Sequence, residues 1–164
     1  MNIARFQHVA DAQYQSAALP DSLPLKDVHL PRRATAGSAG YDFVCTADVT
    51  LAPGEAITIP TGIRCEMQPG WVLMLFPRSG LGFKHQVRLA NTVGVIDADY
   101  FHAENEGHIM VRIANGQSPC SMGSHEVTIR KGERFCQGIF LPHGLAEEDE
   151  VLSDRVGGFG STGK

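Results

Sequence analysis

The sequence has no excess of positive charge and no long apolar run. Its 164 residues carry 14 Lys and Arg against 18 Asp and Glu, which gives a formal net charge of -4. A protein without a basic surface cannot neutralise the phosphates of a long nucleic acid, so we expect no nucleic-acid partner. No apolar run approaches the roughly 20 residues that a membrane helix needs, so we expect no membrane partner.

The N-terminal sequence lacks the features of a secretory signal. MNIARFQHVADAQYQ has no charged start, no apolar segment and no small-residue cleavage site, so we expect an intracellular, cytoplasmic protein. Charged residues make up only 20% and hydrophobic residues 43%, which argues against a disordered or coiled-coil chain. The length fits one domain, which can bury roughly 70% of its unfolded surface without a disulfide or a structural metal.

Cysteine and histidine are present without a metal-binding pattern. None of the four cysteines, Cys45, Cys65, Cys120 and Cys136, belongs to a C-x-x-C pair, so neither a zinc ribbon nor a redox motif is expected. Free cysteine is usually a small buried hydrophobic residue, and we predict that role here. The seven histidines show no H-x-H or H-x-x-x-H spacing.

The apolar residues occur mainly in short segments typical of β-strands. Expected strands cover residues 3–9, 55–63, 71–76, 86–90, 108–115, 125–129 and 134–142. The run WVLMLF at 71–76 is apolar throughout, which predicts burial on both faces. Glycine and proline turns separate the strands at near-regular intervals, which indicates an all-β sandwich, barrel or jelly roll. We expect one short helix, over residues 9–18, and no second domain.

The last eight residues, GGFGSTGK at 157–164, include four glycines. Such a segment cannot bury enough surface to order itself, so one interpretation is a frayed terminus. The other is an arm that closes over a ligand, with amides and hydroxyls on phosphate oxygens and Phe159 stacked on a planar ring.

Two further segments contain candidate functional residues. Arg78, Ser79 and Gly80 follow the apolar run and could form a compact anion site, although such a sequence is more often a simple turn. Asp97 and Asp99 would point to the same face of an extended segment. Either both are solvated at a turn, or one accepts a proton from an attacking water while Asp99 binds backbone amides.

Cationic and amide side chains recur near glycine-rich turns. Arg134 and Gln137 accompany the last predicted strand, and Arg155 precedes the C-terminal glycines. Together with Arg78, these residues fit a polyphosphate partner. The residues by themselves therefore predict an all-β protein with a phosphate site and a candidate general base.

Five segments, in order, resemble the motifs of the homotrimeric dUTPase family. They are GSAGYDF (37–43), PRSGLGFKH (77–85), NTVGVIDADY (91–100), GERFCQ (132–137) and RVGGFGSTG (155–163). The resemblance implies a distorted jelly-roll (β-clip) barrel over residues 1–154, with an N-terminal extension at about 1–24. It also implies a homotrimer in which the arm, residues 155–164, is swapped or crosses to another subunit.

The resemblance further implies hydrolysis of dUTP to dUMP and pyrophosphate, which keeps uracil out of DNA and supplies dUMP for thymidylate synthesis. Asp97 matches the aspartate that deprotonates the water attacking the α-phosphorus. Tyr100 matches the tyrosine that packs on the deoxyribose. The groups implied at the uracil are Asn91, the backbone around Val95 and Ile96, and Met110.

For the phosphates, the resemblance implies contacts from Arg78, Ser79, Gly80 and Gln137. Arg155 would meet the γ-phosphate, and Phe159 would stack over the uracil. Gly160, Ser161 and Thr162 would wrap the phosphates. Mg²⁺ would be held by phosphates and water, with Asp42 structural or in the outer shell.

Two departures from the family pattern stand out. Extra residues follow Tyr100, in YFHAENEGHI, and the last motif is one residue shorter between Arg155 and Phe159. Two alternatives stay open at this point, namely a dCTP deaminase-like enzyme and a nucleotide-sensing regulatory protein on the same fold.

Overall fold

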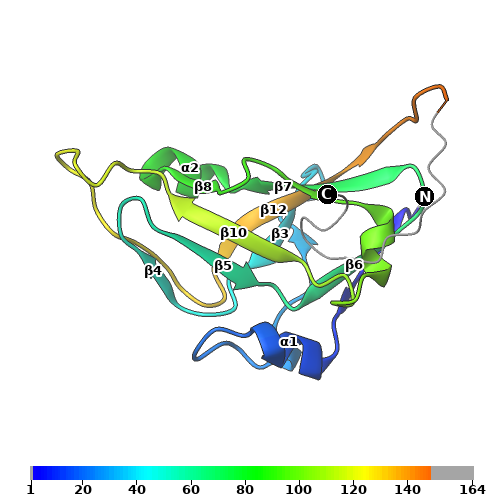
Figure 1. Ribbon diagram of the computed structural model, residues 1–164, viewed down its shortest axis with the longest axis horizontal. Coiled ribbons are helices and arrows are strands. Elements are labelled where there is room, and N and C mark those ends of the chain that lie inside the picture. Colours follow the sequence, from blue (N-terminus) through cyan, green and yellow to red (C-terminus); the bar gives the residue numbers. More distant parts are fainter. Residues whose placement is uncertain (1, 149–164) are drawn as a thin grey trace.

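The computed structural model describes residues 2–148, which fold mainly into β-strands (Figure 1). The largest sheet has the order β2-β3-β12-β7-β9. Its strands are β2 (Arg32–Arg33), β3 (Tyr41–Val44), β12 (Arg134–Pro142), β7 (Trp71–Pro77) and β9 (Gly94–Ile96). The nine residues of β12 make it the longest strand in the described chain, and its neighbours on both sides are antiparallel to it.

Three smaller sheets complete the described chain. The first has the order β5-β10-β8, with β5 (Ala56–Pro60), β10 (Met110–Asn115) and β8 (Val87–Leu89). The second pairs β11 (Val127–Ile129) with β4 (Val49–Leu51), and the third pairs β1 (Ala4–His8) with β6 (Ile63–Met67). In Figure 1, β10 crosses over β12 of the large sheet. Residues of the large sheet and of the β5-β10-β8 sheet belong to one core cluster.

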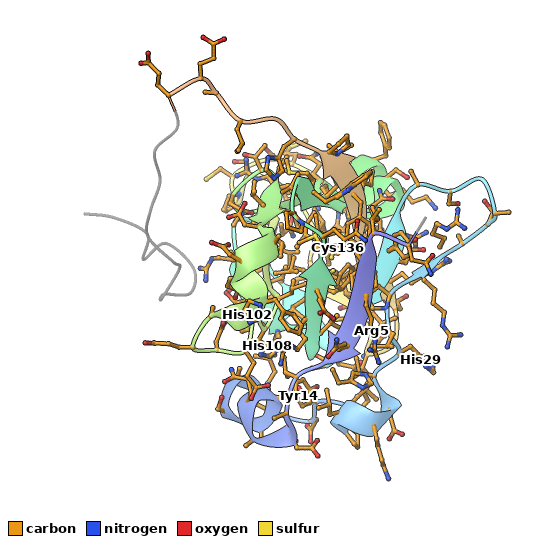
Figure 2. All side chains as sticks on the ribbon, turned by 90° about the vertical axis from the view of Figure 1, so that its right-hand side faces the viewer. Arg5, Tyr14, His29, His102, His108 and Cys136 are labelled. Atoms are coloured by element: carbon orange, nitrogen blue, oxygen red, sulfur yellow. The ribbon has the colours of Figure 1, made fainter. Side chains whose placement is uncertain are left out.

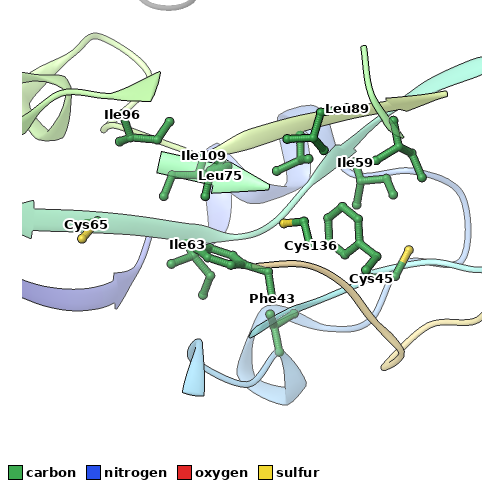
Figure 3. Packing of buried hydrophobic residues seen from close by; sticks show 14 of the residues in the cluster. Phe43, Cys45, Ile59, Ile63, Cys65, Leu75, Leu89, Ile96, Ile109 and Cys136 are labelled. Carbon is green, nitrogen blue, oxygen red and sulfur yellow. The ribbon is translucent and has the colours of Figure 1, made fainter. Parts of the chain in front are cut away.

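The core lies between these sheets and consists mainly of branched aliphatic and aromatic side chains (Figure 3). Cys45, Cys65 and Cys136 are buried in it, as predicted. Burial raises the pKa of the Cys45 thiol to about 11 and that of Cys65 to about 12, and it also raises the pKa of Cys136. The prediction was wrong for Cys120, which is exposed on the loop between β10 and β11.

The N-terminal segment is part of this core. The pairing of β1 with β6 runs over five residues, and the helix α1 (Asp11–Ala17) follows within the predicted range. Tyr14 of α1 is fully buried, and its hydroxyl donates a hydrogen bond of 3.0 Å to the carbonyl of Leu23. A short 3₁₀-helix, η1 (Leu25–Asp27), then leads to the large sheet.

Several details differ from the sequence-based expectation. The predicted strand 55–63 ends at Pro60, because Gly62 adopts a φ of +72° and turns the chain between β5 and β6. A second helix, α2 (Ser79–His85), occupies the segment expected to be a turn. On β7, Leu73 and Leu75 are buried, whereas the alternate side chains on the other face are only half-buried. The strands β2, β3, β4 and β9 were not predicted, and β6 shares only Ile63 with a predicted strand.

None of the helices within residues 2–148 is long and apolar enough to cross a membrane. The predicted arm and its boundary at residue 155 lie outside the described residues.

Candidate active site

A pocket of about 550 Å³ opens between the large sheet and the β5-β10-β8 sheet. Most of its lining residues are apolar, and the polar ones are Thr58, Asn91 and Arg112. Its lining residues are Thr58, Leu75, Leu89, Ala90, Asn91, Gly94, Ile96, Met110, Val111 and Arg112. A concave, largely apolar site with a few polar groups is the usual form of a small-molecule pocket, so we call it the base pocket.

A tight turn between β8 and β9 forms one wall of the base pocket. Thr92 has a φ of +69°, and its amide donates to the carbonyl of Leu89 at 3.0 Å. The turn places the predicted residues Asn91 and Ile96 in the pocket, together with Met110 from β10. The side chain of Val95 is 52% exposed and does not line the pocket.

Asp97 directly follows β9. It is the residue before the 3₁₀-helix η2 (Ala98–His102), and the Tyr100 amide donates to its carbonyl at 3.2 Å. Asp97 and Asp99 are both exposed, but the predicted extended segment is wrong, because Asp99 lies inside the 3₁₀-helix. The alternation that would put both carboxylates on one face therefore does not apply.

Tyr100 is almost fully buried, with 3% of its surface exposed. Its hydroxyl donates to the carbonyl of His108 at 2.8 Å and accepts a hydrogen bond from Nδ2 of Asn105, also at 2.8 Å. Sequence reasoning did not single out Asn105 or His108. The only indication was the extra chain between Tyr100 and the next strand.

His108 lies on the side of the molecule that carries α1, close to Tyr14 (Figure 2). Its Nε2 accepts the backbone N–H of Gly62 at 2.9 Å, so the proton of the neutral ring is on Nδ1. Nδ1 is buried without a hydrogen-bond partner among residues 2–148. Burial lowers the pKa of His108 to about 4, an effect that the nearby Glu106 partly opposes.

A second set of predicted residues meets at the end of β7. Asp42 Oδ1 lies 3.1 Å from Nε of Arg78, and Asp42 Oδ2 lies 3.1 Å from Nη1 of Arg134. The Asp42 side chain is 9% exposed, whereas those of Arg78 and Arg134 are 33% and 49% exposed. The carboxylate therefore orients two guanidinium groups that still reach solvent.

Arg78 and Arg134 line a second pocket, of about 430 Å³, which we call the cationic pocket. Its lining residues are Arg78, Gly80, Leu81, Lys84, His85, Ile129, Gly132, Glu133 and Arg134. Ser79 is exposed at the first position of α2. Lys84, on the last turn of α2, adds a positive charge that sequence reasoning did not assign to this site.

Gln137 lies on β12, opposite Asp42 of β3 and Phe76 of β7. Its Nε2 donates to the carbonyl of Pro77 at 3.3 Å. A Cβ atom on Gly40 would stand 2.5 Å from Oε1 of Gln137, so the carboxamide occupies the space that a side chain at residue 40 would fill. The position of Gln137 therefore depends on glycine at this site.

Residues 26–163 match the dUTPase family. A deoxyuridine 5'-triphosphate nucleotidohydrolase of Lactococcus lactis is 44% identical over 139 residues, which cover 83% of this chain and 89% of that protein. The enzyme of the same name from Escherichia coli K12 is 42% identical over 147 residues, which cover 85% and 90%. The chain belongs to the dUTPase family.

Solved dUTPases have the same fold. The dUTPase from Streptococcus mutans matches with a TM-score of 0.66 and 34% identity, over 87% of this chain and 98% of that one. An aspartate-to-asparagine variant of the dUTPase from phage phi11 of Staphylococcus aureus matches with a TM-score of 0.67 and 20% identity, over 93% and 98%. That structure was described for the coordination of a structural Mg(II) ion.

The predicted dUTPase residues fall into separate places in this chain. The base pocket and the cationic pocket share no lining residue, and neither is lined by Asp97 or Tyr100. The remaining predicted contacts lie outside the described residues, namely Arg155, Phe159, Gly160, Ser161 and Thr162.

Proposed function

We propose that the chain hydrolyses dUTP to dUMP and pyrophosphate. The observation that carries the proposal is the turn between β8 and β9, which forms a wall of the base pocket and leads through β9 to Asp97. A carboxylate at this position can deprotonate a water that attacks the α-phosphorus of a bound nucleotide. The names of the relatives favour this reaction over the dCTP deaminase-like alternative.

The base pocket would hold the uracil. Asn91 and the backbone around Val95 and Ile96 would pair with the polar edge of the ring, and Met110 would contact its apolar part. The narrow turn would leave no room for the methyl group of thymine, and cytosine would present the wrong donors and acceptors. Tyr100 would pack on the deoxyribose and exclude a ribose hydroxyl.

The cationic pocket would hold the phosphates. Arg78, Ser79 and Gly80 would contact them at the start of α2, and Gln137 would do so from β12. Arg155 would meet the γ-phosphate and Phe159 would stack over the uracil, while Gly160, Ser161 and Thr162 would close over the phosphates.

Mg²⁺ would be bound by the phosphates and by water, and it would offset the charge of the triphosphate. Within residues 2–148, no group of three or more His, Cys, Asp or Glu side chains is placed to hold a metal ion. Both oxygens of Asp42 already face guanidinium nitrogens at 3.1 Å. Asp42 therefore fits an outer-shell role better than direct coordination of the metal.

We further infer a homotrimer of distorted jelly-roll barrels, with sites that combine residues from different subunits. The separation of the base pocket and the cationic pocket in a single chain supports this arrangement. Residues 155–164 would cross to a site on another subunit. Light scattering of the purified protein tests the subunit number, and a monomer that hydrolyses dUTP would overturn the shared sites.

The reaction is tested by measuring pyrophosphate release from dUTP, dCTP, dTTP and UTP, with and without Mg²⁺. We expect turnover of dUTP alone, stimulated by Mg²⁺, and unselective turnover would overturn the proposal. Asp97→Asn should almost abolish turnover while dUTP still binds, because the amide cannot accept the proton of the water. Substantial turnover by this variant would remove Asp97 from its proposed role.

A further inference from the structure

The chain between Tyr100 and β10 folds back against Tyr100. We call residues 101–109 the Tyr100 loop. Within this loop, the amide of His108 donates to the carbonyl of Asn105 at 3.0 Å. The amide of Glu106 donates to the carbonyl of Ala103 at 2.8 Å. These local hydrogen bonds give the loop a defined shape, which fixes the position of the Asn105 side chain.

The orientation of the Asn105 carboxamide is set by its neighbours. The backbone N–H of Gly107 donates to Oδ1 at 3.2 Å, so Nδ2 faces Tyr100. Nδ2 donates to the Tyr100 hydroxyl at 2.8 Å, and the hydroxyl donates onward to the carbonyl of His108 at 2.8 Å. The hydroxyl thus uses its donor and an acceptor within this loop.

Gly107 brings the loop close to the backbone of Tyr100. It has a φ of +69°, and a Cβ atom there would stand 2.7 Å from the carbonyl oxygen of Tyr100 and 2.7 Å from Cα of Phe101. Only glycine permits this approach without moving the backbone at Tyr100.

Two distant segments hold the Tyr100 loop in place. Oε2 of Glu106 accepts the backbone N–H of Ala10 at 2.8 Å, which joins the loop to the N-terminal segment. Arg64 of β6 lies 3.8 Å from the same carboxylate and donates to the carbonyl of Phe101 at 3.2 Å. Its guanidinium also lies 3.6 Å from the centre of the Phe101 ring.

We propose that Asn105 is a positioning residue for Tyr100 and so contributes to the selection of deoxyribose over ribose. The inference rests on the proposed function, in which the Tyr100 ring packs on the sugar. A ring held at its hydroxyl end cannot tilt to admit a 2′-hydroxyl. When Asn105 no longer donates this hydrogen bond, only the bond to the His108 carbonyl holds the hydroxyl, so the ring tilts more readily and UTP becomes a better substrate.

The test compares kcat/KM for dUTP and UTP in Asn105→Asp. Aspartate keeps the acceptor for the Gly107 N–H but cannot donate to the hydroxyl. One hydrogen bond is worth about 0.5–1.5 kcal/mol. We therefore expect the ratio of kcat/KM for dUTP to kcat/KM for UTP to fall by about two- to tenfold. Glu104→Gln, at an exposed position of the same loop, is the matched control and should leave the ratio unchanged.

A double-mutant cycle separates positioning from a general effect on folding. Tyr100→Phe removes the hydroxyl, so it should lower the ratio by itself, and Asn105→Asp should then have no further effect on the ratio. Should Asn105→Asp alone fail to fold, Tyr100→Phe still tests whether the held hydroxyl matters. A variant that loses thermal stability but keeps the wild-type ratio would show that Asn105 is merely structural and would overturn the inference.

Hydrogen exchange of the Tyr100 hydroxyl, followed by NMR, tests the contact without any turnover. We expect faster exchange in Asn105→Asp than in the wild type, and equal rates would overturn the positioning role. Poor selectivity of the wild type for dUTP would instead overturn the proposed function, and the exchange rates would still decide whether Asn105 holds Tyr100.

Discussion

The stability of the protein should fall steeply as the solution is acidified, and His108 should account for much of the loss. Its pKa is about 4 in the folded chain against an ordinary value of 6.5, because the buried ring cannot be hydrated when charged. Below about pH 6.5 the unfolded chain takes up a proton that the folded chain does not. The stabilising contribution is therefore complete above this range and is lost as the pH falls toward 4.

The size of the effect follows from the two pKa values. One pKa unit corresponds to about 1.36 kcal/mol, so His108 should remove about 2 kcal/mol from the free energy of unfolding between about pH 7 and pH 5. Protonation also places a second N–H where the Gly62 N–H now donates to Nε2. That hydrogen bond cannot form with the charged ring, which is a further reason why the folded chain resists protonation of His108.

The assay is urea unfolding of the wild type and of His108→Gln at fixed protein concentration, at several pH values from 7 to 5. Glutamine can still accept the Gly62 N–H but does not titrate. We compare the free energy of unfolding of the wild type with that of the variant, because the contribution of the other six histidines cancels in the difference. This difference should shrink by about 2 kcal/mol as the pH falls from 7 to 5. A difference that does not change with pH, or an NMR titration that places the pKa of His108 above 6, would refute the reasoning.

Three other substitutions or treatments test the described contacts. Gly40→Ala should displace the Gln137 carboxamide and raise KM for dUTP several-fold. It should cost little thermal stability, because only the mobile end of the Gln137 side chain must move. An unchanged KM would contradict the contact between Gln137 and the phosphates. Asp42→Asn should lower the free energy of unfolding by about 1–3 kcal/mol in urea titrations, because Arg78 loses its charged partner. For the same reason it should lower kcat/KM for dUTP. Wild-type kinetics would show that Asp42 does not orient Arg78. A thiol reagent at neutral pH should label the native protein at Cys120 alone, as judged by peptide mass spectrometry, because burial and raised pKa values suppress reaction at the other three cysteines.

Much of the β-structure was predictable because the chain alternates apolar and polar residues where one face of a strand is buried. The strand β12 has the predicted bounds, and β7 is within one residue of them. The helix α2 was not predictable from propensity, because Gly80 and Gly82 are poor helix formers, and no apolar periodicity marks it, since none of its residues is buried. The strands β2, β4 and β9 have only two or three residues, too few to show an alternation.

The candidate site shows the same limits. Asn91, Ile96 and Met110 line one pocket, but their contacts with uracil stay a prediction, and the pairing of Asp42 with Arg78 and Arg134 required the structure. The bond from Asn105 to Tyr100 depends on a loop whose shape comes from its own backbone hydrogen bonds. No short sequence pattern encodes such a loop, so its role emerges only in three dimensions. A cytoplasmic location stays a prediction.

The central position of β12 has a consequence for synthesis on the ribosome. The strands β3 and β7 are made early, yet neither pairs with the other, and both pair with residues 134–142. During translation these two strands have exposed edges until β12 emerges, which makes the nascent chain vulnerable to aggregation and favours protection by chaperones. A ribosome stalled before residue 134 should therefore carry a chain that proteases cleave readily, and release of the finished chain, which frees β12, should produce resistance in one step.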